Sequence, residues 1–418
     1  MVHKRLTLLL VVGLLASFGG FSVGQAQDDR ITTIALVNGT LIDGTGADPV
    51  PDAVIVIQAG RIVAVGARAD VEIPADAQII DVGGGTMLPG FFNTHVHEGY
   101  NQAYLTSWVQ AGVTTVRDMG IQDVSGWPDD QLPPLPDEMD PFRAMLIKGF
   151  AIRDLTRQDT RYARLVAAGP FLNVPGGYGG TVYEAESPEE VQAAVNDLLD
   201  LGADLIKTAL DDGQVIGQQL PIYSPETFGV LVEAAHERGV PVAVHIMRSE
   251  PLLMAIEAGV DEIEHMAVDP LPDDVIQQAV EHDVYWVPTL ELWKGVSEEY
   301  GANFREITLD NVARFTSAGG KIALGTDFHG YFTPFEEGMP ITEINLMHEA
   351  GMTPMEIIMS ATLHAAEVCQ LDNDLGTLEV GKIADVLVID GDPLADLQTL
   401  LNVRWVLRDG VVVREPAS

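Results

Sequence analysis

The chain has 418 residues, of which 47% are hydrophobic, so it can bury a large core and is not an intrinsically disordered protein. Its 23 Lys and Arg residues stand against 62 Asp and Glu residues, a formal net charge of -39. Such an acidic chain repels nucleic acid and anionic lipid, which excludes nucleic-acid binding. The single cysteine, Cys369, permits neither an internal disulfide nor a cysteine-based zinc site.

The first 27 residues have the features of a signal peptide. Lys4 and Arg5 give a positive start, residues 6–16 are apolar, and Gly24-Gln25-Ala26 is a small-residue cleavage site. We therefore predict a signal peptide over residues 1–27 and a periplasmic or secreted protein. An uncleaved anchor is the alternative, because the apolar stretch continues to Val23. We expect no stable membrane insertion after cleavage.

Both ends of the remaining chain carry short β-like runs separated by turns. The C-terminal end includes a hairpin pattern with Asp409-Gly410 at the turn. We predict a small β-sandwich assembled from residues 28–88 and 368–418. The runs behind this prediction are residues 34–37, 53–58, 61–65, 384–389, 403–407 and 411–413.

The central region, residues 89–367, alternates strand-like runs with amphipathic helical stretches. Repeated β-then-α units indicate a parallel sheet, and eight of them predict an α/β fold of the (β/α)8 TIM-barrel type. The Pro- and Asp-rich stretch 127–141 is interpreted as a surface loop. The predicted strands are 91–96, 114–117, 171–174, 204–208, 240–245, 260–264, 284–288 and 321–325. The predicted helices include 188–201, 225–238, 273–282 and 309–318.

His95 and His97 lie two residues apart on a predicted buried strand. Residues at this spacing point to the same side of a strand, so both imidazoles can reach one divalent metal ion. Taken alone, such a pair is more often a pair of satisfied core histidines than a metal site.

Four further metal-competent residues lie on or just after other predicted strands, and strand ends of a parallel barrel converge on one site. Each has a structural alternative: an exposed lysine, a hydrogen-bonded core histidine, a loop cap or a helix cap. Together they favour a functional site. The full set is His95, His97, Lys207, His245, His265 and Asp327.

The motifs resemble those of the amidohydrolase superfamily, and most closely the imidazolonepropionase-related branch that includes metal-dependent Xaa-Pro dipeptidases. The resemblance covers almost everything after residue 31. Its motifs are PGFFNTHVH (89–97), GVTTVRD (112–118), Ile206-Lys207, VAVH (242–245), IEH (263–265), GTD (325–327) and the tail GTLEVGKIAD (376–385).

The resemblance implies two divalent metal ions, with zinc the expected metal and manganese or cobalt compatible with the same ligands. His95, His97 and Asp327 would hold the more buried ion, and His245 and His265 the more exposed one. Lys207, carboxylated by carbon dioxide, would bridge both ions.

The function implied is hydrolysis of an amide, peptide or cyclic-amide C–N bond in a small molecule. A hydroxide bridging the metals would attack the carbonyl, and Asp327 would carry its proton to the leaving nitrogen. Two alternatives stay open: a lactone or phosphoester hydrolase using the same site, and a non-catalytic solute-binding barrel. We also expect a homo-oligomer.

Substrate-binding residues are predicted from their positions alone. Tyr178 lies in a glycine-rich loop where many relatives carry a histidine, and Val244 stands where dipeptidase-like relatives often carry a tyrosine. The second difference weakens a dipeptidase assignment. The predicted substrate-contacting residues are Tyr178, Arg117, Tyr223 and His329.

Overall fold

The computed structural model describes residues 33–136, 138–331 and 333–416. The predicted signal peptide, residues 1–27, lies outside the described residues. Among the helices of the described part, none combines the length and the apolar character that crossing a bilayer requires.

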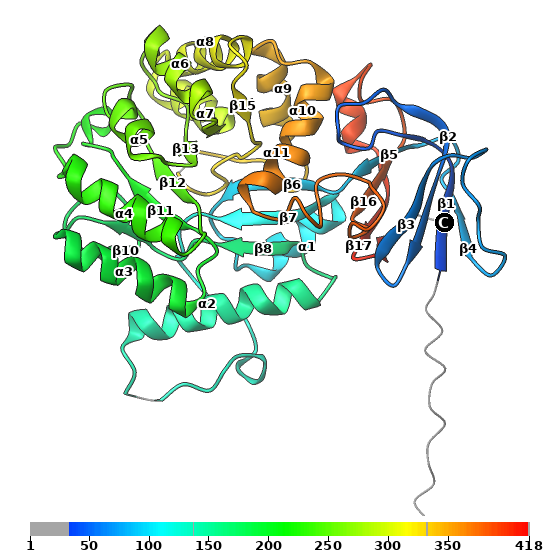
Figure 1. The fold of residues 1–418 in the computed structure, drawn as a ribbon, viewed down its shortest axis with the longest axis horizontal. Coiled ribbons are helices and arrows are strands. Elements are labelled where there is room, and N and C mark those ends of the chain that lie inside the picture. Colours follow the sequence, from blue (N-terminus) through cyan, green and yellow to red (C-terminus); the bar gives the residue numbers. More distant parts are fainter. Residues whose placement is uncertain (1–32, 137, 332, 417–418) are drawn as a thin grey trace, which may run out of the picture. The chain divides into compact units, whose positions relative to one another are not determined.

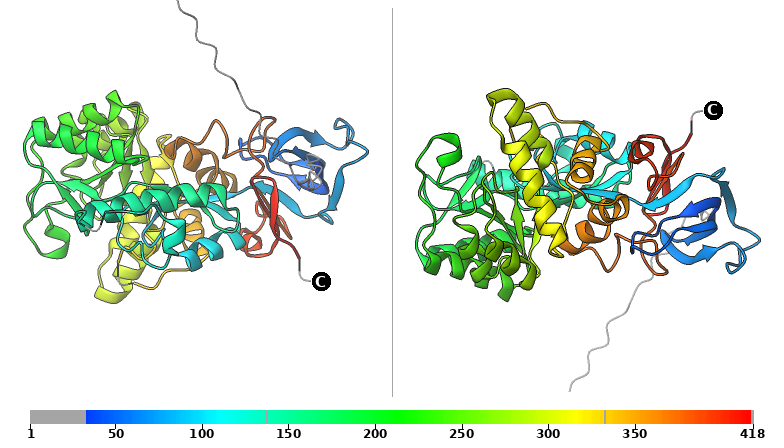
Figure 2. Two further views of the ribbon diagram at one scale, coloured as in Figure 1. Left: turned by 90° about the horizontal axis from the view of Figure 1, so that it is seen from below. Right: turned by 90° about the horizontal axis from the view of Figure 1, so that it is seen from above.

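One sheet takes its strands from both ends of the chain, and Figures 1 and 2 show the blue and red strands lying together. Its order is β18-β17-β16-β5-β1-β2-β3, with β4 beside β1. The predicted β-rich region built from both termini is therefore confirmed. Hydrogen bonds join its eight strands into one sheet, whereas the prediction was a β-sandwich. The strands are β1 (Thr33–Leu41), β2 (Val50–Gln58), β3 (Arg61–Ala67), β4 (Gln78–Asp81), β5 (Thr86–Pro89), β16 (Val386–Ile389), β17 (Val403–Arg408) and β18 (Val411–Arg414).

Local sequence explains how this sheet turns and packs. Asp409 and Gly410 have φ values of 52° and 74°, as the tight turn of the β17–β18 hairpin requires. Along β1, Leu36 and its neighbour Ala35 pack into different apolar clusters, because successive side chains point to opposite faces.

The central region contains two parallel sheets with helices around them (Figure 1). One has the order β6-β7-β8, and the other β10-β9-β11-β12-β13-β14-β15. Their strands are β6 (Phe91–Val96), β7 (Val113–Asp118), β8 (Arg164–Ala167), β9 (Phe171–Asn173), β10 (Val182–Glu184), β11 (Ile206–Ala209), β12 (Val242–His245), β13 (Glu262–Glu264), β14 (Tyr285–Val287) and β15 (Lys321–Ile322).

Backbone hydrogen bonds connect the two parallel sheets on both sides. After β15 the chain runs along β6, where Thr94 N donates to Leu324 O at 2.9 Å and His97 N donates to Phe328 O at 2.8 Å. On the other side, Asp204 N donates to Ala167 O at 2.9 Å. The described strands form no continuous closed ladder, so the parallel α/β architecture is confirmed and full barrel closure stays a prediction.

The third parallel strand differs from the sequence prediction. We placed it at residues 171–174, but β8 occupies this position and pairs with β7. Residues 171–173 form the separate strand β9, which pairs with β10 and β11. Strand β8 was not predicted because its first residue is the charged Arg164, which the sequence pattern does not show to be buried. In the structure, ion pairs with two aspartates allow Arg164 to be buried.

The helices begin and end where the sequence supplies caps. Ser187 and Glu190 form a reciprocal capping box at the start of α3, and Gly202, with φ 111°, ends it. The predicted helix 188–201 is thus confirmed, and the other three predicted helices correspond to α4, α6 and α8. The helices are α1 (Gln102–Gln110), α2 (Pro141–Gln158), α3 (Pro188–Leu201), α4 (Pro225–Glu237), α5 (Leu252–Ala258), α6 (Asp273–Glu281), α7 (Leu290–Tyr300), α8 (Phe304–Ser317), α9 (Ile341–Glu349), α10 (Pro354–Ser360) and α11 (Leu363–Val368), with short 3-10 turns at Asp129–Gln131, Gln214–Ile216 and Leu397–Leu401.

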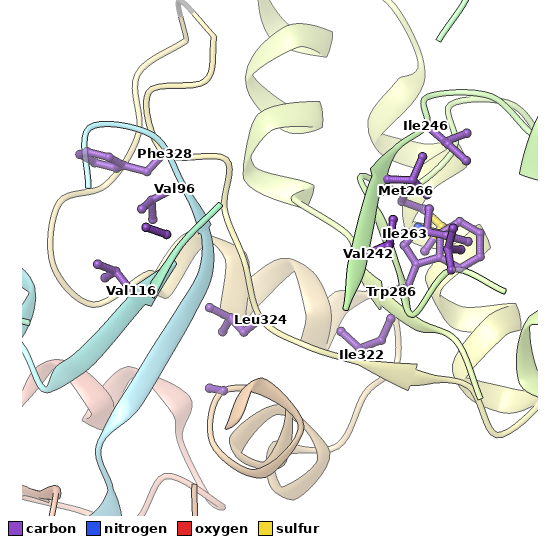
Figure 3. Packing of buried hydrophobic residues seen from close by; sticks show 14 of the residues in the cluster. Val96, Val116, Val242, Ile246, Ile263, Met266, Trp286, Ile322, Leu324 and Phe328 are labelled. Atoms are coloured by element: carbon purple, nitrogen blue, oxygen red, sulfur yellow. The ribbon is translucent and has the colours of Figure 1, made fainter. Parts of the chain in front are cut away.

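A large apolar cluster packs between these strands and helices. Figure 3 shows Trp286, Ile263 and Met266 in contact on one side, with Val96 and Phe328 on another. All five side chains are at most 2% exposed. The strand ends that carry the candidate ligands are therefore anchored in close-packed surroundings.

A buried ion-pair cluster ties the parallel strands to the β-rich sheet. Arg164 on β8 donates to Asp385 Oδ2 and to Asp409 Oδ1, both at 2.8 Å. Asp385 precedes β16 and Asp409 lies in the β17–β18 turn, so one guanidinium contacts two segments more than 200 residues distant in sequence.

We expect Arg164→Leu to lower the free energy of unfolding by about 3 kcal/mol, because Asp385 would be left buried without its cation. Urea unfolding followed by circular dichroism measures the change. Arg238→Leu is the matched control: Arg238 pairs with Asp200 at the surface, and its loss should cost less than about 1 kcal/mol. Equal unfolding midpoints for the two variants would contradict the stabilising role of Arg164.

Candidate metal centre

Three of the predicted ligands meet at one point. His95 lies near the carboxyl end of β6 and His97 directly follows the strand, so both imidazoles point to the same side. Asp327 Oδ1 lies 3.2 Å from Nε2 of His95 and 3.1 Å from Nε2 of His97. One potential ligand atom from each residue falls within 4.8 Å of the other two, and all three residues are buried.

The backbone brings Asp327 to the histidines by a close approach. Asp327 has φ 61°, and its amide donates to His95 O at 2.9 Å. A Cβ on Gly330 would lie 2.1 Å from Asp327 Oδ1, and one on Gly325 would lie 2.8 Å from His95 Cβ. Glycine at these two positions therefore leaves the space that the carboxylate and the imidazole occupy.

His245 and His265 continue the row of imidazoles. The ring centroid of His265 lies 4.8 Å from that of His95 and 4.4 Å from that of His245. His265 Nδ1 contacts Thr289 Oγ1 at 2.9 Å, and His245 Nε2 contacts Asp211 Oδ2 at 3.3 Å. Burial lowers the pKa of His245, and burial together with the nearby His245 holds the pKa of His265 well below its usual value. Neutral imidazoles are the form that binds metal.

Lys207 on β11 is 1% exposed, and its charge is close enough to lower the pKa of His245 and of His265. Its Nζ atom has no hydrogen-bond partner among the described residues and lies 5.4 Å from the centroid of the Phe171 ring. Burial lowers the pKa of Lys207 to about 8, although the charges of Glu264 and Asp327 act in the opposite direction. A buried, unpartnered amine is costly, which indicates that the native site supplies a partner or a modification.

A buried charge network supports His95 from behind. Glu264 Oε2 lies 2.5 Å from His95 Nδ1, and Glu264 Oε1 accepts from Arg117 at 3.0 Å. Arg117 also binds Glu262 through two hydrogen bonds of 2.6 and 2.7 Å. Burial opposes ionisation of Glu264, but His95 and Lys207 together lower its pKa below the usual value. The carboxylate thus fixes the His95 ring with Nε2 facing Asp327.

Two adjoining cavities open onto this row of histidines. The first, of about 490 Å³, is polar and is lined by His95, His97, Gln122, Phe171, the loop residues 176–180, Ile216, Gln218, Leu220, His245, His265, Asp327 and Gly330. The second, of about 370 Å³, shares Tyr178, Ile216, His245, His265, Asp327 and Gly330 with the first. A small molecule in either cavity would therefore touch the candidate metal centre.

The structure places the four predicted substrate-binding residues in different surroundings. Tyr178 lines both cavities and stacks on His245, with ring centroids 3.9 Å apart. Arg117 is fully buried and its guanidinium is taken up by Glu262 and Glu264, so it supports the site from below and does not line a cavity. Neither Tyr223 nor His329 lines either cavity: the Tyr223 hydroxyl donates to Ala185 O at 3.0 Å, and His329 stacks on Phe328.

Sequence reasoning missed the residues that orient the ligands, namely Glu262, Glu264, Asp211 and Thr289. A signal was present for the first two. Glu262 and Glu264 lie two apart on the buried strand β13, so both carboxylates point to the same buried side and require cationic partners there.

Comparisons with known proteins agree with this geometry. A putative prolidase from Bifidobacterium longum is 28% identical, with a TM-score of 0.76 over 93% of this chain and 96% of that one. A Xaa-Pro dipeptidase solved with methionine in its active site is 26% identical, with a TM-score of 0.75 over 91% of this chain and 99% of that one.

Ochratoxinase from Aspergillus niger is 25% identical over 91% of this chain and 86% of its own length. Residues 86–413 match the model of the amidohydrolase family, which has a TIM-barrel fold with a β-rich domain and acts on C–N bonds. The chain belongs to the amidohydrolase family and is a hydrolase of C–N bonds.

Proposed function

We propose that this protein is an exported, metal-dependent amidohydrolase that cleaves an amide, peptide or cyclic-amide C–N bond in a small molecule, at the end of a closed (β/α)8 barrel. One observation carries the proposal: His95, His97 and Asp327 meet beside His265, and the nearby buried Lys207 amine has no hydrogen-bond partner among the described residues. The hydrogen bonds that connect the two parallel sheets support barrel closure.

The donor set fits two divalent ions. His95, His97 and Asp327 would hold one ion, and His245 and His265 the second. The Lys207 ammonium would lose one proton to become the neutral amine, and addition of carbon dioxide at Nζ with loss of a second proton would give a carbamate anion available to both ions. The absence of any described hydrogen-bond partner for Nζ supports this assignment, as does the neutral state that burial favours for His245 and His265. Nitrogen and oxygen ligands in this combination favour zinc.

Bound divalent ions supply a lowered pKa for water and polarisation of the substrate carbonyl. The chain supplies the proton transfer and the orientation of the substrate. Asp327, which faces both cavities, accepts a proton from the attacking water and returns it to the leaving nitrogen as the C–N bond breaks. The hydroxyl of Tyr178 is positioned to donate a hydrogen bond to a polar group of the substrate.

A substrate panel tests this function. The protein is reconstituted with zinc, manganese or cobalt and assayed on dipeptides, N-acyl amino acids, anilides, cyclic ureides, lactones and phosphoesters. We expect C–N bonds to be cleaved faster than the ester bonds. Turnover of only lactones or phosphoesters would replace the proposal with a different hydrolase function on the same site.

We expect Asp327→Asn to fold normally and to lose at least about 100-fold in kcat on any substrate found, because the amide cannot accept the proton. Circular dichroism and metal analysis accompany the kinetics, so that a lost ion is separated from a lost proton acceptor. Asp212→Asn, near the surface, is the control and should keep its rate. A near wild-type rate for Asp327→Asn would remove Asp327 from this role.

We expect Lys207→Ala to bind little metal and to show no turnover, since the shared anionic ligand is gone. A short carboxylic acid such as acetate should restore part of both by occupying the space of the carbamate. Plasma emission spectroscopy measures the metal content independently of activity. Lys321→Ala, which removes a surface lysine paired with Asp283, is the control and should retain its metal. Full metal content in Lys207→Ala would contradict the assignment.

The proposal of an exported protein is supported by the leader pattern of residues 1–27, and homo-oligomerisation accompanies it as a further expectation. Cell fractionation with N-terminal sequencing tests the first, and light scattering of the purified protein tests the second. A full-length protein in the cytoplasm, or a monomer, would contradict the respective expectation.

A further inference from the structure

The second cavity lies beside the metal centre and is lined mostly by apolar side chains. We call it the apolar chamber. Its residues other than those shared with the polar cavity are Val215, Met247, Leu292, Trp293, Val296, Tyr300, Ala302, Phe304 and Tyr331. Several of them form an apolar cluster that is separate from the large core cluster. A cavity of about 370 Å³ lined this way favours an apolar ligand group.

Helix α7 supplies one wall of the apolar chamber. Leu292, Val296 and Tyr300 recur every four residues, which places them on one face of the helix. Trp293 packs edge-on against the metal-centre residue His265, with ring centroids 6.2 Å apart, and against Phe304 at 5.9 Å. An apolar group in the chamber would thus lie directly beside the candidate ligands.

Trp293 is a closely packed part of the chamber wall. The side chain is 2% exposed, and its indole N–H has no hydrogen-bond partner among the described residues.

No lysine or arginine lines either cavity in the described part of the chain. The cations nearest in sequence to the chamber residues are already paired. Arg248 binds Asp212 at 3.2 Å and Glu250 at 3.0 Å, Lys294 binds Glu298 at 3.0 Å, and Arg305 binds Glu349 at 2.6 Å. A substrate carboxylate in the chamber would therefore be buried without a cationic partner, which is costly.

We infer that the apolar chamber selects substrates by the group that they place in it. It accepts a neutral, apolar group, as in aryl or alkyl amides and anilides, and it rejects a group that carries a free carboxylate. This inference rests on the proposed function and names its substrate class. The net charge of -39 acts in the same direction, because it disfavours the approach of an anionic substrate.

Two matched pairs of probes test the inference on the metal-loaded protein. The first pair is 4-methylacetanilide and 4-acetamidobenzoate, with the ring on the amine side. The second is 4-methylphenylacetamide and its 4-carboxylate, with the ring on the acyl side. Binding is measured by tryptophan fluorescence and hydrolysis by product release. For at least one pair, the neutral compound should bind at least about tenfold more tightly than the carboxylate.

A charge placed in the wall sharpens the test. Val296→Lys should narrow or reverse the preference by providing a cation, whereas Val380→Lys, at a 65% exposed site outside the cavity linings, adds the same charge and should leave the preference unchanged. Equal or tighter binding of the carboxylates, no binding of any probe, or no response to Val296→Lys would overturn the inference. Selective binding of neutral probes without hydrolysis of any amide would leave the inference intact and count against the proposed function.

Discussion

The contact between Glu264 and His95 is the constraint on which the metal centre depends. A histidine can offer a chosen nitrogen to a metal only if its other nitrogen is fixed, and here Glu264 fixes it from a fully buried position. Glu264 is itself held by Arg117, which also neutralises Glu262. With Asp327 included, the buried carboxylates outnumber the single guanidinium. This surplus of buried carboxylates fits the proposed site for divalent cations.

The same region shows how strand ends become a binding site. Parallel strands bring their carboxyl ends together, but the ligands need the chain to turn immediately after the strand. His265 and Asp327 do so with φ values of 70° and 61°, a conformation that costs about 1 kcal/mol or more for residues other than glycine. Hydrogen bonds to the neighbouring strands offset this cost: His265 N donates to Val287 O, and Asp327 N donates to His95 O, each at 2.9 Å. The ligand positions are thus maintained by the sheet itself.

This physical picture explains which parts of the site could be predicted from sequence. Metal-competent residues at successive strand ends were sufficient to bring His95, His97 and Asp327 together, and the turn and cap signals located most helices. The pairing of Arg117 with Glu262 and Glu264 could not be predicted, because both faces of a strand in this fold are buried and the pattern of β7 does not tell which polar residue faces a cavity. The strand β8 was missed for a related reason: Arg164 reads as a surface residue until its two aspartate partners, far away in the chain, are known.

The division of the site into a polar cavity and an apolar chamber constrains how a substrate can lie. Both cavities share Tyr178, His245, His265 and Asp327, so the scissile carbonyl must be placed where they meet. In the proposed binding mode, hydrogen-bonding groups of the substrate would lie on the side of the glycine-rich loop, and apolar groups on the side of α7. Filling the chamber removes water next to His265, which strengthens every electrostatic interaction at the reacting carbonyl. An apolar substituent would then contribute to turnover as well as to affinity, because its burial would complete the dry surroundings for the proton transfer proposed for Asp327.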